Sequence, residues 1–334
     1  MIARPMLSVA VVLPAFLLGN FAASWGGPAL LQAPEAEIPR ALPPVGRAGV
    51  PSSGPQADGQ SPAPLAQPIP PPQPAWVAAP ASPVEAGFHL LYQLKFQQAR
   101  QQFSEWEKQH PDDPMGYSAE AASYLFEEFN DQGVLTSEFF LDDRRLLGGI
   151  PGRPDDRLGA AFHQAVDRAQ KLGESRVERD PRDVSGLLAM TMTNGMLADY
   201  SSLIEKRQMA TLHLLGVSEG FAKRLLAVDP GAGDAYVALG VSNYILACLP
   251  AYKRFFLRLG GVHGDKAVGM HQLEQAVATG NYLQPYAELL LALTSLREKE
   301  PERAQALLAQ LSSEFPQNPL FARELAKLGA LRGP

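Results

Sequence analysis

The stretch AKRLLAVDPGAGDAYVALGVSN, residues 222–243, decides how the rest of this 334-residue sequence is interpreted. Apolar residues recur at helical spacing on both sides of Asp229-Pro230. Proline ends the first helix because it lacks the N–H that a continuing helix needs. Gly240 follows among apolar residues, where a small side chain lets a second helix approach closely. The stretch therefore predicts two helices that are joined by a proline turn and packed against neighbouring helices.

The same pattern of helix, proline turn and helix recurs elsewhere in the chain. Ala99-x3-Phe103 precedes Pro111, and the next helix opens with Tyr117, Ala121 and Tyr124. Ala304-x3-Leu308 precedes Pro316, and a weaker version occupies residues 169–181. The closing prolines are unevenly spaced along the chain: Pro111, Pro181, Pro230 and Pro316. We therefore expect insertions at about 132–154, 201–207 and 249–264.

This pattern resembles the tetratricopeptide repeat, a helix pair of about 34 residues with a W-x2-L-G-x2-Y cluster, A-x3-F and a closing proline. Tyr236-x2-Leu239-Gly240-x2-Asn243 carries the strongest match. The resemblance covers most of residues 85–331 and implies an all-α, right-handed superhelix of about five helix pairs, with 320–331 as a charged capping helix. A weaker resemblance, carried by Gly260-Gly261-Val262-His263-Gly264-Asp265, is to the inclusion-body-clearance subgroup, and no function is carried over from it.

Members of the tetratricopeptide superfamily mostly bind peptide termini or helices in a concave groove, so the resemblance implies a non-enzymatic scaffold with a protein or peptide partner. The groove is lined by the first helix of each pair. The expected partner-binding residues are apolar: Leu125, Phe126, Val237, Val241, Leu289 and Leu293. No lysine and asparagine set accompanies them, which favours an apolar partner segment over an acidic chain end. The alternative is that part of this lining is only core.

The amino terminus has the layout of an export signal. Arg4 precedes an apolar stretch that ends at Phe21, and Ala22-x-Ser24 would suit signal peptidase. The apolar stretch is also nearly long enough to span a bilayer, so residues 1–27 are either a cleaved signal or an anchor that tethers the chain through residues 6–23. We expect an exported protein of the periplasm or cell envelope, with anchoring in the inner membrane as the alternative. Lipidation is excluded because Cys248 is the only cysteine.

Residues 28–84 hold more than half of the thirty prolines, mixed with alanine, glycine, glutamine and serine. Such a composition cannot build a core, and proline favours extended backbone. We expect a disordered, semi-stiff linker between the amino terminus and a helical domain at 85–331.

Two insertions carry apolar residues together with charges. Residues 134–147 combine a dense apolar run with Asp142, Asp143, Arg144 and Arg145. We expect this insertion to fold back and plug the solenoid, with the aspartates paired to the arginines or capping a short helix. A partner-binding flap is the alternative. In residues 250–259 helical spacing places Tyr252, Phe255, Phe256 and Leu259 on one face. That pattern fits either an anionic membrane surface or a core-packed helix.

Composition and motifs argue against several other functions. The net charge of −6, without a basic block, argues against nucleic acid. No G-x-S-x-G, phosphate-binding loop or dinucleotide fingerprint occurs, so we expect no catalytic residues and no cofactor. His271 and Glu274, with His263 and Asp265 upstream, are the best candidates for a metal, but their spacing matches no established motif. The alternatives to a scaffold are a self-assembling homo-oligomer and, less favoured, a metal-dependent enzyme.

Overall fold

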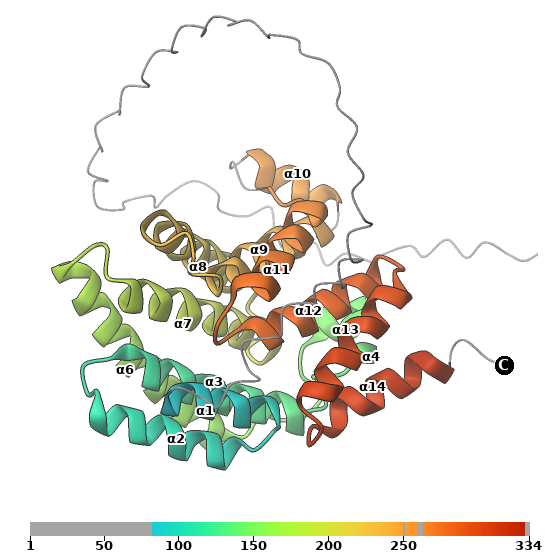
Figure 1. Cartoon of the computed structure of the whole chain (residues 1–334). Helices are drawn as coiled ribbons and strands as arrows, with labels where there is room; N and C mark the ends of the chain where they lie inside the picture. The colour runs from blue at the N-terminus through green and yellow to red at the C-terminus, as the bar shows by residue number, and fades with distance from the viewer. Residues whose placement is uncertain (1–81, 250, 260–262, 331–334) are drawn as a thin grey trace, which may run out of the picture. The chain divides into compact units, whose positions relative to one another are not determined.

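The computed structural model describes residues 82–249, 251–259 and 263–330, and within these ranges it contains fourteen helices and no strand (Figure 1). Ten helices form five packed pairs: α1 (Pro83–Tyr92) with α2 (Phe96–Gln109), α3 (Pro114–Asp131) with α6 (Asp156–Arg179), α7 (Val184–Leu203) with α8 (Gln208–Val228), α9 (Ala235–Cys248) with α11 (Lys266–Thr279), and α12 (Gln284–Arg297) with α13 (Pro301–Glu314). A terminal helix, α14 (Pro319–Ala330), packs on α13. The predicted all-α stack of five pairs and a capping helix is confirmed.

The remaining three helices are short and lie in connections within pairs. Between α3 and α6 come α4 (Ser137–Leu141) and α5 (Asp143–Gly148), and between α9 and α11 comes α10 (Ala251–Leu259). The expected insertions at 132–154 and 249–264 therefore exist. The one expected at 201–207 is wrong, because α7 continues to Leu203 and a short turn leads into α8. The extra length of that unit comes from its two long helices.

Small residues make the close helix contacts within pairs. Each second helix of a pair buries one alanine completely, at Ala99, Ala169, Ala222, Ala276 and Ala304. Where α9 crosses α11, a Cβ atom added to Gly240 would lie 3.0 Å from the backbone oxygen of Gly269. The two backbones are therefore in direct contact, which only a residue without a Cβ allows.

Two of the closing turns combine a helix cap with a proline. After Pro111 the carboxylate of Asp113 accepts from the Met115 N–H at 3.1 Å, and after Pro181 that of Asp183 accepts from the Gly186 N–H at 2.7 Å. Such caps satisfy N–H groups that a helix start leaves without a partner. In these two turns the proline stops one helix and the aspartate starts the next.

The turn that closes the fourth pair has no proline, which is why the repeat was hidden there. Asp234, at the start of α9, is buried and accepts from the N–H groups of Asn281, Tyr282 and Leu283 at 2.9, 3.1 and 2.9 Å. These three donors precede α12 or lie at its N-cap. The long interval between Pro230 and Pro316 therefore contains two helix pairs.

The first helix contacts the last repeat, so the two ends of the stack meet. The rings of Phe88 and Tyr282 stack with centroids 5.2 Å apart, and the Tyr92 hydroxyl donates to the Tyr282 carbonyl at 2.8 Å. The Asn318 amide, at the start of α14, donates to the Tyr92 carbonyl at 2.8 Å. This seam joins α1 to α12 and α14.

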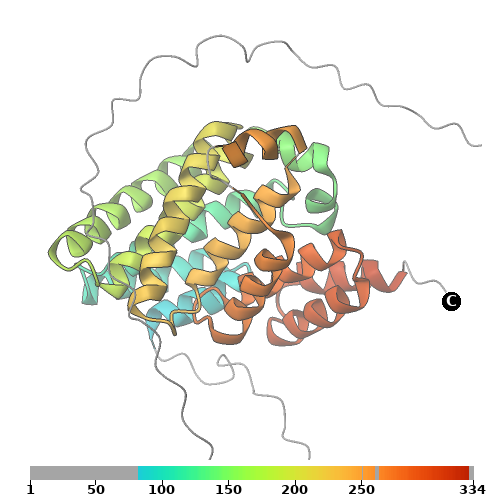
Figure 2. The ribbon, with the colours of Figure 1, turned by 90° about the horizontal axis from the view of Figure 1, so that it is seen from above.

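Residues 137–148, the α4–α5 segment, fold back on the carboxyl-terminal helices (Figure 2). Arg297 on α12 donates to the Phe140 carbonyl at 2.5 Å and pairs with Asp143 at 2.6 Å. Asp142 caps α5 by accepting from the Arg144 N–H at 2.8 Å. The expected folding back is confirmed, with one correction: Asp143 pairs with the distant Arg297 instead of a neighbouring arginine.

A second set of contacts joins the α4–α5 segment to α14. The backbone N–H of Ser137 donates to Glu324 at 3.2 Å, and the Ser137 hydroxyl donates to the same carboxylate. Lys327 pairs with both Glu138 and Glu324, at 3.1 and 2.9 Å. The terminal helix is therefore bound by the insertion as well as by α13.

The first described helix, α1, begins at Pro83. Ser82 caps α1 by accepting from the Glu85 N–H at 3.2 Å. The predicted signal or anchor at 1–27 and almost all of the predicted linker precede the described residues. None of the helices that the structure describes is both long and apolar enough to cross a membrane.

Candidate interaction surface

The six residues predicted to line the groove fall into two classes. Leu125, Val237 and Leu293 are buried, with 2%, 6% and 8% of their surface exposed. Phe126, Val241 and Leu289 are half-buried. Only the second class offers surface to a partner without rearrangement of the core.

Leu125 and Phe126 are neighbours on α3 but face different parts of the molecule. Leu125 lines a crevice together with Phe162 and Tyr200, and this crevice is too narrow to hold a water molecule. Phe126 packs edge-on against Tyr286 of α12, with ring centroids 5.4 Å apart. The divergence follows from the helix turn of about 100° per residue.

Tyr286 lies where α3, α9 and α12, the first helices of three pairs, come together. It contacts Phe126 of α3, and it packs on the small cluster of Val237, Ala276 and Ala287, against which Val241 of α9 also packs. Leu289 stands one helical turn further along α12. The half-buried residues Phe126, Val241, Tyr286 and Leu289 are called the inner surface below. The sequence signal for Tyr286 was an aromatic residue on an apolar helix face, but nothing local distinguished it from core.

An acidic group acts on this surface. Burial raises the pKa of Asp199, on α7, to about 7. Burial raises the pKa of Tyr286 well above its ordinary value, and the charge of Asp199 adds to that rise. A carboxyl group that changes charge near neutral pH therefore acts on an apolar surface, where it could accept a hydrogen bond or attract a cation.

Two further acidic groups are buried between α12 and α13. Glu288 is fully buried, and its Oε2 accepts from the amides of Gln284 and Gln310 at 3.4 and 3.3 Å. Burial, with a smaller contribution from Glu314, raises the pKa of Glu288 to about 8. Burial raises the pKa of Glu314 to about 7. These groups lie within the packing of one pair.

The predicted metal candidates have other roles. His271 Nδ1 lies 3.3 Å from Glu274 Oε2, and Glu274 also forms an ion pair with Arg303. Asp265 caps α11 by accepting from the Val268 N–H at 3.0 Å. Within the described ranges, no group of three or more histidine, cysteine, aspartate or glutamate residues is placed to hold a metal ion.

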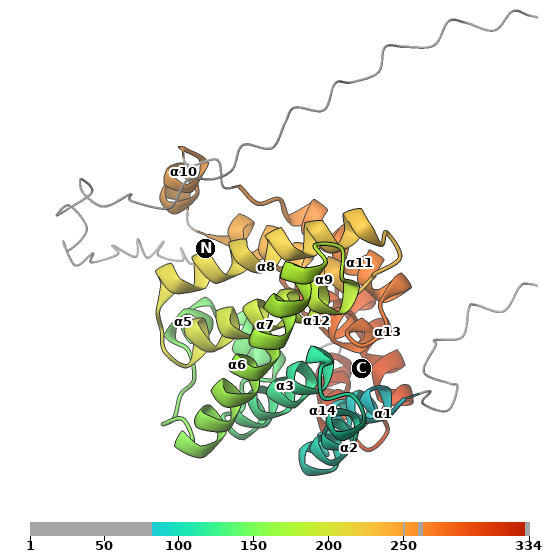
Figure 3. The ribbon, with the colours of Figure 1, turned by 90° about the vertical axis from the view of Figure 1, so that its left-hand side faces the viewer.

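The helix α10 carries the most exposed aromatic residues of the described chain, outside the row of pairs (Figure 3). Tyr252, Phe255 and Leu259 are 55%, 60% and 73% exposed. The core-packed interpretation of this insertion is therefore wrong for these three residues. Arg254 donates to the Ala247 carbonyl of α9 at 3.1 Å. Because Arg254 lies opposite the aromatic stripe at helical spacing, this bond turns the stripe outward.

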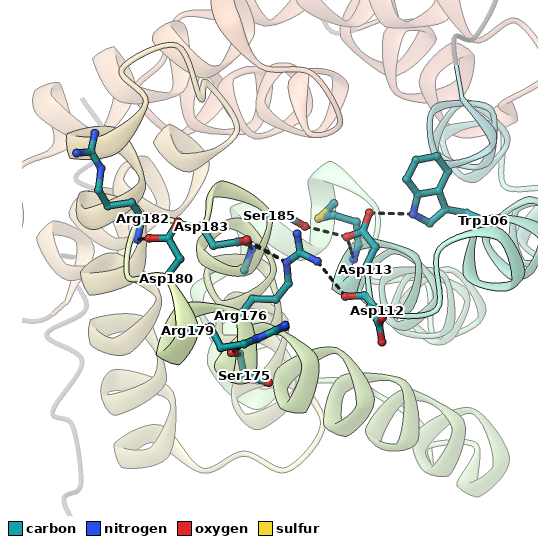
Figure 4. A network of polar contacts seen from close by, with 12 residues as sticks. Trp106, Asp112, Asp113, Ser175, Arg176, Arg179, Asp180, Arg182, Asp183 and Ser185 are labelled. Carbon is teal, nitrogen blue, oxygen red and sulfur yellow. Dashed lines mark hydrogen bonds and ion pairs between the residues drawn. The ribbon is translucent and has the colours of Figure 1, made fainter.

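A network of charged residues joins two closing turns (Figure 4). Arg176 binds Asp183 at 3.0 Å and donates to the Asp112 carbonyl at 3.1 Å. Asp113 accepts from Trp106 Nε1 at 3.1 Å and from the Ser185 hydroxyl at 2.8 Å. Every member contacts a turn or a helix start, so the network holds consecutive repeats together.

These features define a class of protein: a solenoid of helix pairs with the architecture of tetratricopeptide repeats. No family model matches the sequence, and no curated protein matches it. Among solved structures, the chain is similar to a thermophilic tetratricopeptide-repeat protein from Thermus thermophilus. The identity is 18%, the TM-score is 0.42, and the match covers 74% of this chain and 96% of that protein. At this level of similarity the comparison carries nothing about function.

Proposed function

We propose that this chain is a protein-interaction scaffold that binds an apolar peptide or helix of a partner on its inner surface. The observation that supports the proposal best is the convergence of α3, α9 and α12 on Tyr286, which leaves Phe126, Val241 and Leu289 half-buried. Half-buried apolar residues held by a rigid stack are already ordered, so a partner side chain gains burial at a low entropic cost.

The Asp199 carboxyl gives this surface a polar element. An apolar site with one ionisable group prefers a partner that brings a hydrogen-bond donor or a cation beside its apolar side chains. Because its pKa is about 7, Asp199 gains charge as the pH rises through neutrality. Affinity for a cationic partner would then rise over the same interval, whereas affinity for a neutral apolar segment would change little.

The proposed place of action is the cell envelope. It rests on the export-signal layout of residues 1–27 and on the proline-rich composition of 28–84. A chain of that kind would hold the scaffold at a distance from a membrane, or release it after cleavage, with the partner reached by the helical body.

A pair of matched substitutions tests the binding surface. Val241→Asp places a charge on the inner surface, and Val268→Asp makes the same change on α11 at a side chain that is 46% exposed. We expect crosslinking in intact envelopes, followed by mass spectrometry, to show at least a roughly tenfold loss of a reproducible partner for Val241→Asp only. Added salt should hardly change capture by the parent, since apolar contact is not screened.

Two outcomes would contradict the proposal. Capture that survives Val241→Asp in a folded variant, but is lost when His271 and Glu274 are replaced, would restore the metal-site alternative. Light scattering that finds a dimer, broken by Val241→Asp, would instead make the inner surface a contact between copies of this chain.

A further inference from the structure

The insertion helix α10 combines exposed apolar residues with a concentration of positive charge. Its nine residues, AYKRFFLRL, include Lys253, Arg254 and Arg258 and no acidic residue, in a chain whose net charge is −6. The local charge is therefore opposite in sign to that of the whole protein. Three cations without an acidic residue on one exposed helix point to an anionic surface as their counterpart.

The geometry separates the apolar side of α10 from the side that faces the protein. Tyr252, Phe255 and Leu259 follow one another at helical spacing, and each is more than half exposed. Arg254, on the opposite side, is bonded to the end of α9. Within the described chain α10 packs along none of the other helices, so its outward side is not part of the stack (Figures 1 and 3).

We propose that α10 rests on the surface of an anionic membrane. Tyrosine, phenylalanine and leucine on one side of a helix, with lysine and arginine around them, are the composition of helices that lie in the interface plane. The aromatic side would enter the boundary between head groups and acyl chains, and the exposed Arg258 would contact lipid phosphates. This inference goes beyond the proposed binding of a partner, which uses the inner surface.

One short helix binds a membrane weakly, so α10 would act as a second contact that orients a protein already held nearby. Linking two weak contacts raises the effective concentration at the second one. The predicted signal or anchor at 1–27 would supply the first contact. The role of α10 would then be to set which side of the solenoid faces the bilayer.

The test uses the full chain and a fluorophore that reports the polarity around one residue. Cys248, the only cysteine, is replaced by alanine, and a cysteine is introduced either as Leu259→Cys on α10 or as Met209→Cys on α8. These positions are closely matched, with 73% and 76% exposure. Each protein is labelled with a nitrobenzoxadiazole dye. It is then mixed with vesicles of phosphatidylcholine alone, or of equal parts phosphatidylglycerol and phosphatidylcholine.

We expect the dye at 259 to shift to the blue and brighten with the phosphatidylglycerol vesicles, and the dye at 209 to stay unchanged. Arg258→Glu should weaken the response at 259 by roughly tenfold in lipid concentration. The same charge change at the exposed Lys171 on α6, Lys171→Glu, should leave it intact. Circular dichroism confirms that each variant is folded.

Three results would overturn the proposal. The dye at 259 could stay unchanged while the protein sediments with anionic vesicles, which would show that other residues bind the lipid. Both dyes could respond equally, which would show non-specific adsorption. A blue shift at 259 that rises with protein concentration without any vesicles would assign α10 to contact with a second copy of the chain.

Discussion

The α4–α5 segment and α10 both interrupt a helix pair, and both carry aromatic residues beside charges, yet one is built into the stack and the other is not. In the first, Phe139 is buried and Arg297, Glu324 and Lys327 supply complementary charges from distant helices. In the second, Leu259 is 73% exposed and three cations have no acidic residue within their helix. The comparison teaches that an insertion joins a solenoid when the helices it reaches offer matching charges. Apolar content alone does not decide it.

The largest effect is expected when α9 and α11, the two helices that α10 connects, are forced apart. Gly240→Leu would force α9 away from α11, where Gly269 leaves no room for a side chain, and should cost about 3 kcal/mol of unfolding free energy. Urea denaturation measures the loss. Gly216→Leu on α8 is the control, because Gly216 is exposed and nothing lies within 4 Å of an added Cβ atom, so the change should cost little. Equal midpoints for the two variants would show that the assigned repeat register is wrong.

The unfolding free energy should also depend on pH, through Glu288 on α12, the helix that holds the α4–α5 segment. The pKa of Glu288 is raised to about 8 in the folded state, so the folded protein binds more protons than the unfolded chain between about pH 4.5 and 8. Unfolding free energy should therefore fall as pH rises through that interval.

Glu288→Gln removes this titration and should be more stable than the parent by about 2 kcal/mol near pH 6, with little difference near pH 4.5, because each pH unit above 4.5 costs the parent about 1.4 kcal/mol. Thermal unfolding across this pH range measures both curves. Parallel curves for parent and variant would show that Glu288 does not titrate with a raised pKa.

Breaking the contacts of the α4–α5 segment should have a smaller effect. Arg297→Ala leaves the Phe140 carbonyl without its donor, which should cost about 1.5 kcal/mol; the ion pair with the exposed Asp143 adds little. Hydrogen exchange at 137–148 should accelerate in this variant. Arg323→Ala removes only an exposed arginine 3.7 Å from Glu324 and should leave exchange unchanged. Unchanged protection in Arg297→Ala would mean that the segment is held by other contacts.

The smallest effect on stability is expected in α10. Leu259→Asp changes a side chain that is 73% exposed and should alter unfolding free energy by less than about 0.5 kcal/mol. A loss comparable to that of Arg297→Ala would place α10 in the core under solution conditions and remove the contrast between the two insertions.

Sequence reasoning succeeded where the determining chemistry is local. Proline turns and small residues such as Ala99 and Gly240 act on their own neighbours, so the pairs could be predicted from spacing. It failed where the partner is distant along the chain. Asp234 closes a turn 47 residues away that contains no proline. Asp143 pairs with the distant Arg297 instead of the neighbouring arginines that the sequence suggested. Only half of the residues predicted for the inner surface lie on it. Leu125 is buried and Phe126 is half-buried because of contacts with distant helices, which no local sequence pattern reveals.

The seam between α1 and the last repeat changes how this solenoid should come apart. Linear repeat arrays contact only their neighbours, so their end units fray first and unfolding spreads inward. Here α1 cannot leave without breaking the Phe88 and Tyr92 contacts to Tyr282, and α14 is tied to Tyr92 through Asn318. Because the two ends contact each other, neither end is free to unfold first. A pull applied at Ser82, at the start of α1, would load these contacts of α1 before the contacts of any other repeat.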